Sequence, residues 1–211
     1  MIGFYDYTVL LTYLGVASSV LGMTFLNQPK LIHFSIFCLM FSGLCDMFDG
    51  KVARTKKNRT KQQANFGIQI DSLADVICFG VFPALINYTL STHKLVGCVS
   101  SIMLVLCGII RLGYFNVMEE ERQKETSECR KYYQGLPITA TAIILPTAYL
   151  VKFLLRIETS GGLIFNITCI ITAILNVTDF KFKKPTTREL ILLTVIGMAI
   201  VIAILKVGVF R

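Results

Sequence analysis

Seven long, mostly apolar segments follow one another along the chain, with short polar stretches between them. A helix that crosses the hydrocarbon core of a bilayer needs about 20 such residues. Only 16% of the residues are charged and 54% are hydrophobic, whereas about a quarter of the residues are charged in an ordinary soluble domain. The sequence therefore predicts an all-α fold, a polytopic integral membrane helical bundle.

The predicted spans make one domain of residues 1–211. In chain order they are residues 7–25, 31–48, 70–90, 95–117, 138–155, 163–177 and 190–209. No basic residue precedes the first span and it lacks a clear small-residue cleavage site, so we expect it to be retained rather than removed as a signal peptide. The longest connector, residues 118–135, carries a mixed charge run, and we expect it to be solvated or amphipathic.

The positive charges predict the orientation of the spans. If the spans alternate in direction, residues 51–61, 118–135 and 179–189 lie on one side. Together with Arg111, these regions hold 15 of the 21 Lys and Arg residues. Cytoplasmic loops carry an excess of such residues, so we expect this side to face the cytoplasm, in a multi-pass protein of the cell membrane. The net charge of +8 does not indicate nucleic-acid binding, because it lies in short loops between apolar spans.

Cysteine and histidine offer no metal site in the sequence. The seven cysteines form no CxxC pair, and we interpret them as small buried apolar residues. His33 and His93 lie near span ends without ligand partners close by in the sequence. We therefore expect no zinc site.

Polar residues interrupt the apolar pattern where the second span ends and the third begins. Continued as a helix, the second span places three polar and two small residues on one face: Asp46, Asp49, Gly50, Ala53 and Arg54. The spacing of the next three, Gly67, Asp71 and Asp75, likewise puts them on one face of the following helix. Two neighbouring helices are thus predicted to present four carboxylates to a shared cavity.

Ionisable groups at the edge of a span are costly and usually functional. Four like charges repel one another unless cations neutralise them, and a set of oxygen ligands suits hard ions such as Mg²⁺, Mn²⁺ or Ca²⁺. Two such ions can hold a diphosphate. The small residues Gly50 and Ala53 leave room for a ligand, and Arg54 can pair with phosphate oxygens. A single aspartate at a span end is usually a helix cap, but four on matching faces are hard to explain that way.

The pattern Asp46-x2-Asp49-Gly50-x2-Ala53-Arg54 … Gly67-x3-Asp71-x3-Asp75 resembles the signature of the CDP-alcohol phosphatidyltransferases at all eight fixed positions. One departure is the twelve residues between Arg54 and Gly67, where the family commonly has eight, and we expect the extra residues to lengthen the loop. Three further stretches resemble the membrane-embedded phosphatidylserine synthases of bacteria and archaea: "DSLADVICFGVFPA" (71–84), "RLGYFNV" (111–117) and "GLP" (135–137). The relatives often read "RLARFN" in the second stretch.

The resemblance covers residues 31–146 well, and the C-terminal third only in hydropathy. It implies a bundle of six core spans, commonly dimeric, with an active site open to the cytoplasm and a seventh span added at residues 190–209. It also implies roles within the signature region 46–75. Asp46, Asp49 and Asp71 bind divalent metal, Mg²⁺ or Mn²⁺, with Ca²⁺ an option at one site, and Asp75 is metal ligand and general base. The CDP-lipid pocket is formed by Asp49, Gly50, Ala53, Arg54 and Gly67.

The implied reaction transfers the phosphatidyl group of CDP-diacylglycerol to the hydroxyl of L-serine and releases CMP. Arg111 is a candidate to bind the serine carboxylate, although contact with lipid phosphates explains it equally well. Lys131 is a second candidate for the acceptor site. Two alternatives stay open: a family member using another acceptor, such as a phosphatidylglycerophosphate or phosphatidylinositol-phosphate synthase, and a divalent-cation transporter. An arginine beside a cation path would repel the ion, which argues against the transporter.

Overall fold

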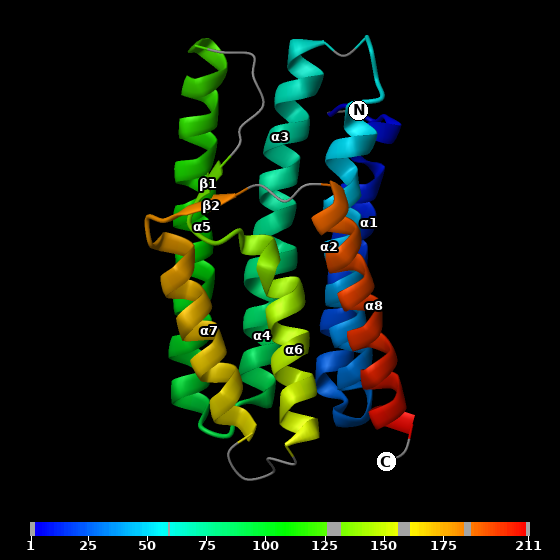
Figure 1. The fold of residues 1–211 in the computed structure, drawn as a ribbon, viewed down its shortest axis with the longest axis vertical. Helices are drawn as coiled ribbons and strands as arrows, with labels where there is room; N and C mark the ends of the chain where they lie inside the picture. The colour runs from blue at the N-terminus through cyan, green and yellow to red at the C-terminus, as the bar shows by residue number, and fades with distance from the viewer. Residues whose placement is uncertain (1–2, 59, 126–131, 156–160, 184–186, 210–211) are drawn as a thin grey trace.

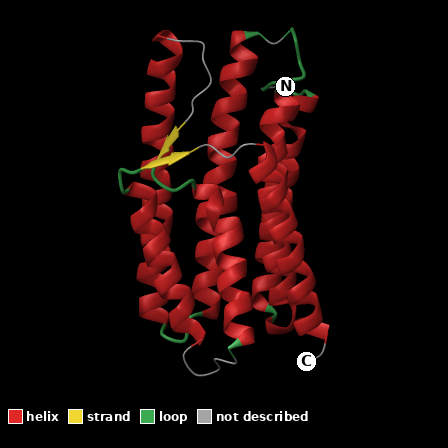
Figure 2. Cartoon of the chain, in the orientation of Figure 1, coloured by secondary structure: helices red, strands yellow, loops and turns green. Residues whose placement is uncertain are grey.

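Helices make up most of the protein in the computed structural model, which describes residues 3–58, 60–125, 132–155, 161–183 and 187–209. The α-helices are α1 (Leu10–Thr24), α2 (Ile32–Ala53), α3 (Lys61–Asp75), α4 (Phe82–Leu90), α5 (Lys94–Glu125), α6 (Thr141–Leu154), α7 (Gly161–Val177) and α8 (Thr187–Val209). A π-helical segment, Val76–Val81, joins α3 to α4. Two short strands, β1 (Tyr132–Gln134) and β2 (Lys181–Lys183), pair with each other (Figures 1 and 2). The predicted helical bundle is confirmed.

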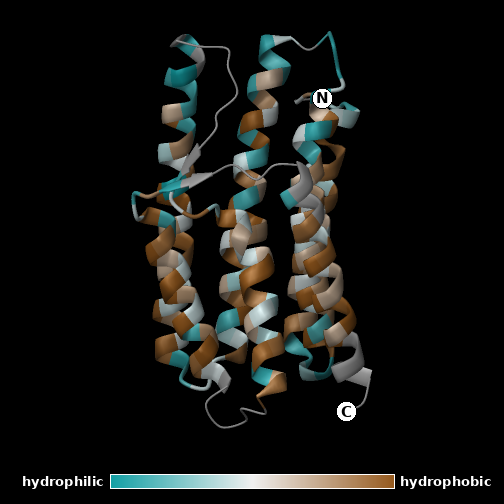
Figure 3. Ribbon diagram, viewed as in Figure 1, coloured by the Kyte–Doolittle hydropathy of each residue, from teal (hydrophilic) through white to brown (hydrophobic). Residues whose placement is uncertain are grey.

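The helical passes run side by side and are apolar over most of their length (Figure 3). Four of them are long and apolar enough to cross a membrane: Tyr7–Asn27, Pro29–Ala53, Lys61–Leu90 and Lys94–Arg122. Three shorter apolar helices, Ile138–Leu154, Gly162–Val177 and Leu192–Ile204, match the remaining predicted spans. The third and fourth passes extend beyond the predicted spans because their ends are helical but polar, and hydropathy detects only the apolar part of a helix.

Small residues hold α1 close against α2. The buried face of α1 consists of Thr12, Gly15, Ser19 and Gly22. A Cβ atom on Gly22 would lie 2.7 Å from Cβ of Cys38, so only glycine allows this approach. Ser42 on α2 donates to the carbonyl of Gly15 at 2.8 Å. In a membrane, where lipid is as apolar as a side chain, such close packing and interhelical hydrogen bonds hold helices together.

The π-helical segment has a cause in the sequence. Pro83 has no backbone N–H, so the carbonyl of Phe79, four residues earlier, loses its α-helical donor. The amide of Phe82 instead bonds back to Ile77, and Thr141 on α6 donates its hydroxyl to the Phe79 carbonyl at 3.0 Å. Segments of this kind often occur at functional sites, and this one starts directly after Asp75.

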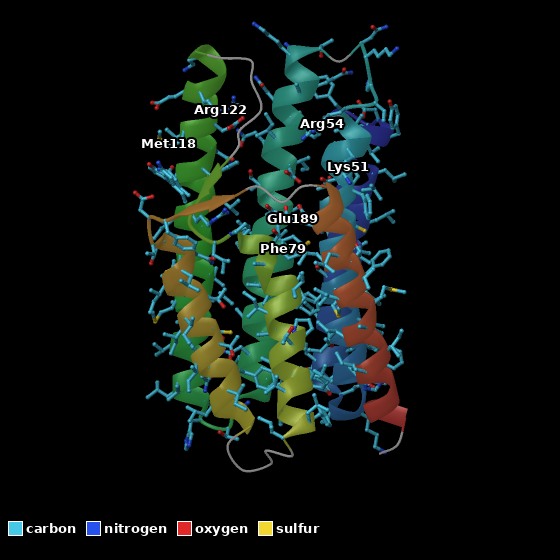
Figure 4. The ribbon with its side chains drawn as sticks, viewed as in Figure 1. Lys51, Arg54, Phe79, Met118, Arg122 and Glu189 are labelled. Carbon is cyan, nitrogen blue, oxygen red and sulfur yellow. The ribbon has the colours of Figure 1, made fainter. Side chains whose placement is uncertain are left out.

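The strands tie two connectors together at one end of the bundle. β1 lies in the α5–α6 connector and β2 in the α7–α8 connector, and they pair in antiparallel register, Tyr132 with Lys183 and Gln134 with Lys181. The alternating directions predicted for the spans place these two connectors on the same side, as observed. The charged end of α5, labelled at Arg122 in Figure 4, lies toward the same end of the molecule as Arg54 at the end of α2.

Gly135, directly after β1, has a backbone conformation that favours glycine. Its φ is +69°, and a Cβ atom there would lie 2.8 Å from the carbonyl oxygen of Asn176. Its amide donates to the Phe180 carbonyl at 2.9 Å, and the amide of Leu136 donates to the Leu175 carbonyl at 3.0 Å. The "GLP" stretch therefore caps the end of α7.

We expect Gly135→Ala to lower thermal stability. A left-handed backbone costs an L-residue about 1–2 kcal/mol, and the contact with the Asn176 carbonyl adds to this. Thermal unfolding in detergent measures the effect. The matched control is Gly113→Ala on α5, where a Cβ would meet nothing within 4 Å and stability should hold or rise. Equal melting temperatures of Gly135→Ala and the wild-type protein would show that the cap of α7 does not need glycine at position 135.

The seventh pass packs against the bundle. α8 contacts α2 and α6, and a Cβ on Gly197 would lie 3.8 Å from Cε of Met40. The hydroxyl of Thr194 donates to Sδ of Met47 at 3.9 Å. α8 therefore covers the side of α2 that carries Met40 and Met47.

Candidate active site

The first two carboxylates lie on the last turns of α2, which stays helical through the polar residues as predicted. Asp46 is half-buried and Asp49 is 8% exposed. Lys51 lies in the last turn, where a cation interacts favourably with the helix dipole. Gly50 is exposed, and a Cβ atom on it would meet nothing within 4 Å. The helix thus ends with open space beside Gly50.

Only the first half of the spacer between Arg54 and Gly67 is a loop, and the second half is helical. Thr60 caps α3: its hydroxyl accepts from the amide of Gln63, while the Gln63 side chain accepts from the amide of Thr60, both at 3.2 Å. This capping box starts the helix at Lys61. The six residues before Gly67 are therefore helical, and the connecting loop ends at Thr60.

The four predicted carboxylates come together. Asp46, Asp49 and Asp71 can each place one oxygen within 4.8 Å of the others. Asp75, one turn along α3 from Asp71, lines the same pocket as these three acids. Two helix ends, α2 and α3, thus bring all four acids into one cluster.

All four acids line one small pocket. α1 forms another wall with Leu11, Thr12 and Gly15, and the π-helical segment contributes Cys78 and Phe79. The hydroxyl of Thr12 donates to Oδ2 of Asp49 at 3.1 Å. Thr12 was not among the site residues predicted from the sequence. The signal was a small and polar stripe in the otherwise apolar first span, which ends at the level of the carboxylates.

The cluster lies near one end of the third pass. Asp75 is fifteen residues from Leu90, the far end of that pass, or about 22 Å along a helix. The hydrocarbon core of a bilayer is about 30 Å thick. A pass with Leu90 at one surface therefore holds Asp75 below the other surface and Asp71, one turn further along, close to it.

The cluster fits divalent metal. All its donors are carboxylate oxygens, which Mg²⁺ and Mn²⁺ prefer. Carboxyls this close cannot all be ionised unless protons or cations offset their charge. Asp46, Asp49, Asp71 and Asp75 are the residues that would hold the metal.

The other predicted site residues that the structure describes lie on α2 or directly after it, on α3, and on α5. Ala53 and Gly67 are half-buried, and Arg54 is exposed at the end of α2. Arg111 on α5 is 8% exposed. Five residues later, Asn116 donates to the hydroxyl of Ser72 at 2.9 Å, which holds α5 next to Asp71. Lys131 lies outside the described residues.

The comparison with known proteins agrees with the signature. The sequence model of the CDP-alcohol phosphatidyltransferase family matches residues 8–177, and the chain belongs to this family. The match ends at the last residue of α7, so α8 lies outside it. With its apolar passes, the family membership makes the chain an integral membrane protein.

Three curated relatives illustrate the similarity. A CDP-diacylglycerol–serine O-phosphatidyltransferase of Methanocaldococcus jannaschii is 30% identical over 191 residues, 90% of this chain and 80% of that protein. The protein of the same name from Saccharomyces cerevisiae is 35% identical over 136 residues, 64% of this chain and 48% of the relative. An archaetidylserine synthase of Methanothermobacter thermautotrophicus is 32% identical over 145 residues, 68% of this chain and 58% of the relative. The chain thus spans about half the length of the yeast protein.

Proposed function

We propose that the protein transfers the phosphatidyl group of CDP-diacylglycerol to the hydroxyl of L-serine, giving phosphatidylserine and CMP. The observation that carries this proposal is the four-carboxylate cluster at one end of the α2–α3 pair, with open space beside Gly50. The similarity to two serine O-phosphatidyltransferases supports serine as the acceptor.

Asp75 is the proposed general base. As the serine oxygen attacks the lipid-linked phosphorus, the carboxylate accepts the hydroxyl proton, and the bond from phosphorus to the CMP oxygen breaks. A positioned base of this kind contributes about 10²–10⁴-fold to a rate. Divalent metal held by the four carboxylates would offset the charge on the diphosphate and on departing CMP.

The donor pocket lies at the end of α2. Gly50 and Arg54 are exposed at the helix end, and Arg54 can donate paired hydrogen bonds to the diphosphate. Ala53 and Gly67 keep the two helix faces free of bulky side chains. This arrangement lets the CDP group approach the carboxylates from the polar side while the lipid tails stay among the apolar passes.

Arg111 is the proposed contact for the serine carboxylate. We expect Arg111→Ala to raise KM for serine at least 10-fold, because a charge-assisted pair of hydrogen bonds is lost. KM for CDP-diacylglycerol should change little. Steady-state kinetics with each substrate varied in turn measure both values. An unchanged KM for serine would leave Arg111 as a lipid or structural contact.

The active site is proposed to face the cytoplasm. Lys57 is exposed in the loop between α2 and α3, and His93 is exposed in the connector at the opposite end of the third pass. The seven native cysteines are first replaced by alanine. In intact cells a membrane-impermeant maleimide should then label His93→Cys and not Lys57→Cys, and both should be labelled once the cells are permeabilised. Labelling of Lys57→Cys from outside would invert the topology.

Two further parts of the proposal concern the assembly. The packing of α8 on α2 and α6 supports a single domain that includes the seventh pass. The family resemblance supports a homodimer in the cell membrane. Cross-linking of the purified protein in lipid nanodiscs would test the dimer directly.

An acceptor panel tests the proposed function. Purified protein receives CDP-diacylglycerol and Mg²⁺ or Mn²⁺, together with serine, glycerol 3-phosphate or inositol phosphate. The proposal predicts CMP release with serine and little with the other two. Turnover with glycerol 3-phosphate alone would replace serine by another acceptor of the same family, and no CMP with any acceptor would favour a transport role.

A further inference from the structure

The residues just before α1 are fastened to both ends of the spacer that separates Arg54 from Gly67. We call residues 3–9 the N-terminal strap. Oδ2 of Asp6 lies 2.7 Å from Nζ of Lys56, and the hydroxyls of Tyr7 and Thr55 are 3.2 Å apart. The rings of Phe4 and Phe66 meet edge to face, with centroids 5.6 Å apart.

These contacts adjoin two signature positions. Thr55 and Lys56 directly follow Arg54, and Phe66 directly precedes Gly67. The strap therefore spans from the start of the spacer to the helix that follows it. The spacer has twelve residues, and six of them precede α3. The strap contacts join its two ends.

Asp6 links this strap to α1. Its Oδ1 accepts from the amide of Thr8 at 2.8 Å and caps the short turn that leads into α1. Hydrogen bonds from Lys56 and then from Thr8 hold the pKa of Asp6 at about 2, below its usual value. The ion pair is therefore intact above pH 3.8 and is lost only as the pH falls through about 2. α1 in turn reaches the carboxylates through Thr12.

We propose that the N-terminal strap positions the Arg54 and Gly67 sides of the donor pocket, with Asp6 acting as a positioning residue through Lys56. The recognised ligand is a cytidine diphosphate group on a lipid. This inference rests on the proposed function only for the identity of that donor and not for the acceptor. An exposed ion pair with no positioning role would contribute little to stability and would leave donor binding unchanged.

Two single variants separate the ion pair from the cap. Asp6→Asn keeps a side-chain oxygen that can cap the turn but loses the charge, and Lys56→Met removes the other partner while keeping the chain length. Each should weaken CDP-diacylglycerol binding about 5- to 10-fold, which corresponds to about 1 to 1.4 kcal/mol. The turnover number and KM for serine should stay within about two-fold of wild type. Lys56→Arg keeps the positive charge and should bind the donor with wild-type affinity.

A double-mutant cycle and a neighbouring lysine complete the test. Asp6→Asn combined with Lys56→Met should weaken donor binding no more than either change alone, because both remove one interaction. The matched control is Lys57→Met, which removes the same charge from the exposed loop without touching the strap and should bind the donor as wild type. The donor dissociation constant is measured without acceptor, so it stays informative even if serine proves to be the wrong alcohol.

The outcomes are distinct. Coupled loss in the two strap variants, with Lys57→Met unaffected, supports positioning by the strap. Wild-type donor affinity in Asp6→Asn and Lys56→Met would overturn it. Equal weakening in Lys57→Met and Lys56→Met would overturn it too, because a general attraction of the anionic donor by the loop would then be the cause.

Discussion

Turnover should fall at least 10³-fold when Asp75 is replaced by asparagine, while CDP-diacylglycerol still binds. Asparagine fills the same space but cannot accept the serine proton, and loss of a positioned base costs about 10²–10⁴-fold in rate. The three other carboxylates, which lie within 4.8 Å of one another, remain to hold metal and donor. CMP release and donor binding are measured on the same preparation.

Two comparisons make the Asp75 result specific. Asp179→Asn removes a carboxylate from an exposed position in the α7–β2 connector and should leave turnover unchanged. The Asp75→Asn protein itself should melt no lower than wild type in metal-free buffer, because removing one acid relieves repulsion in the cluster. Normal turnover in Asp75→Asn would refute its assignment as the base.

Asp71→Asn is expected to produce the second large loss, with a different dependence on metal. Asp71 shares the cluster with Asp46 and Asp49, so its replacement should weaken metal binding. Turnover at a fixed Mn²⁺ concentration should fall by at least the roughly 10–100-fold that the loss of a residue supporting a metal ligand costs. Raising the concentration should recover part of the activity, because the base at Asp75 is intact. A titration of turnover against Mn²⁺ measures this.

The response to metal distinguishes a metal ligand from a general base. Added Mn²⁺ should rescue Asp71→Asn in part and leave Asp75→Asn inactive, since metal cannot supply the missing proton acceptor. If excess metal restored both variants equally, the two carboxylates would have the same role, and the division between ligand and base would be wrong.

The sequence predicted the helical passes and the meeting of the carboxylates because each depends on a local pattern. Asp46 and Asp49 share a face by helical spacing, and so do Asp71 and Asp75. Hydropathy located each pass but not its polar end, which is why α3 begins at Lys61 and not at residue 70. The capping box of Thr60 and Gln63 was readable in the sequence and would have corrected this start.

Other parts of the site depend on contacts between distant residues, and no local pattern contains them. Thr12 reaches Asp49 from a different helix, and Asp6 reaches Lys56 across fifty residues. At the far end of the bundle, Asn87 is fully buried and donates to Ser100 at 2.8 Å. Such partners can be identified only in the packed structure, because they lie far apart in the sequence and no helical repeat relates them.

The most direct test of the proposed function is the stoichiometry of products from CDP-diacylglycerol and L-serine. Purified protein in lipid nanodiscs is given both substrates with Mn²⁺, and CMP and phosphatidylserine are quantified together. We expect equal amounts of the two products, dependent on both metal and serine, and none from Asp75→Asn. CMP release that is independent of serine, or no CMP release at all, would contradict it.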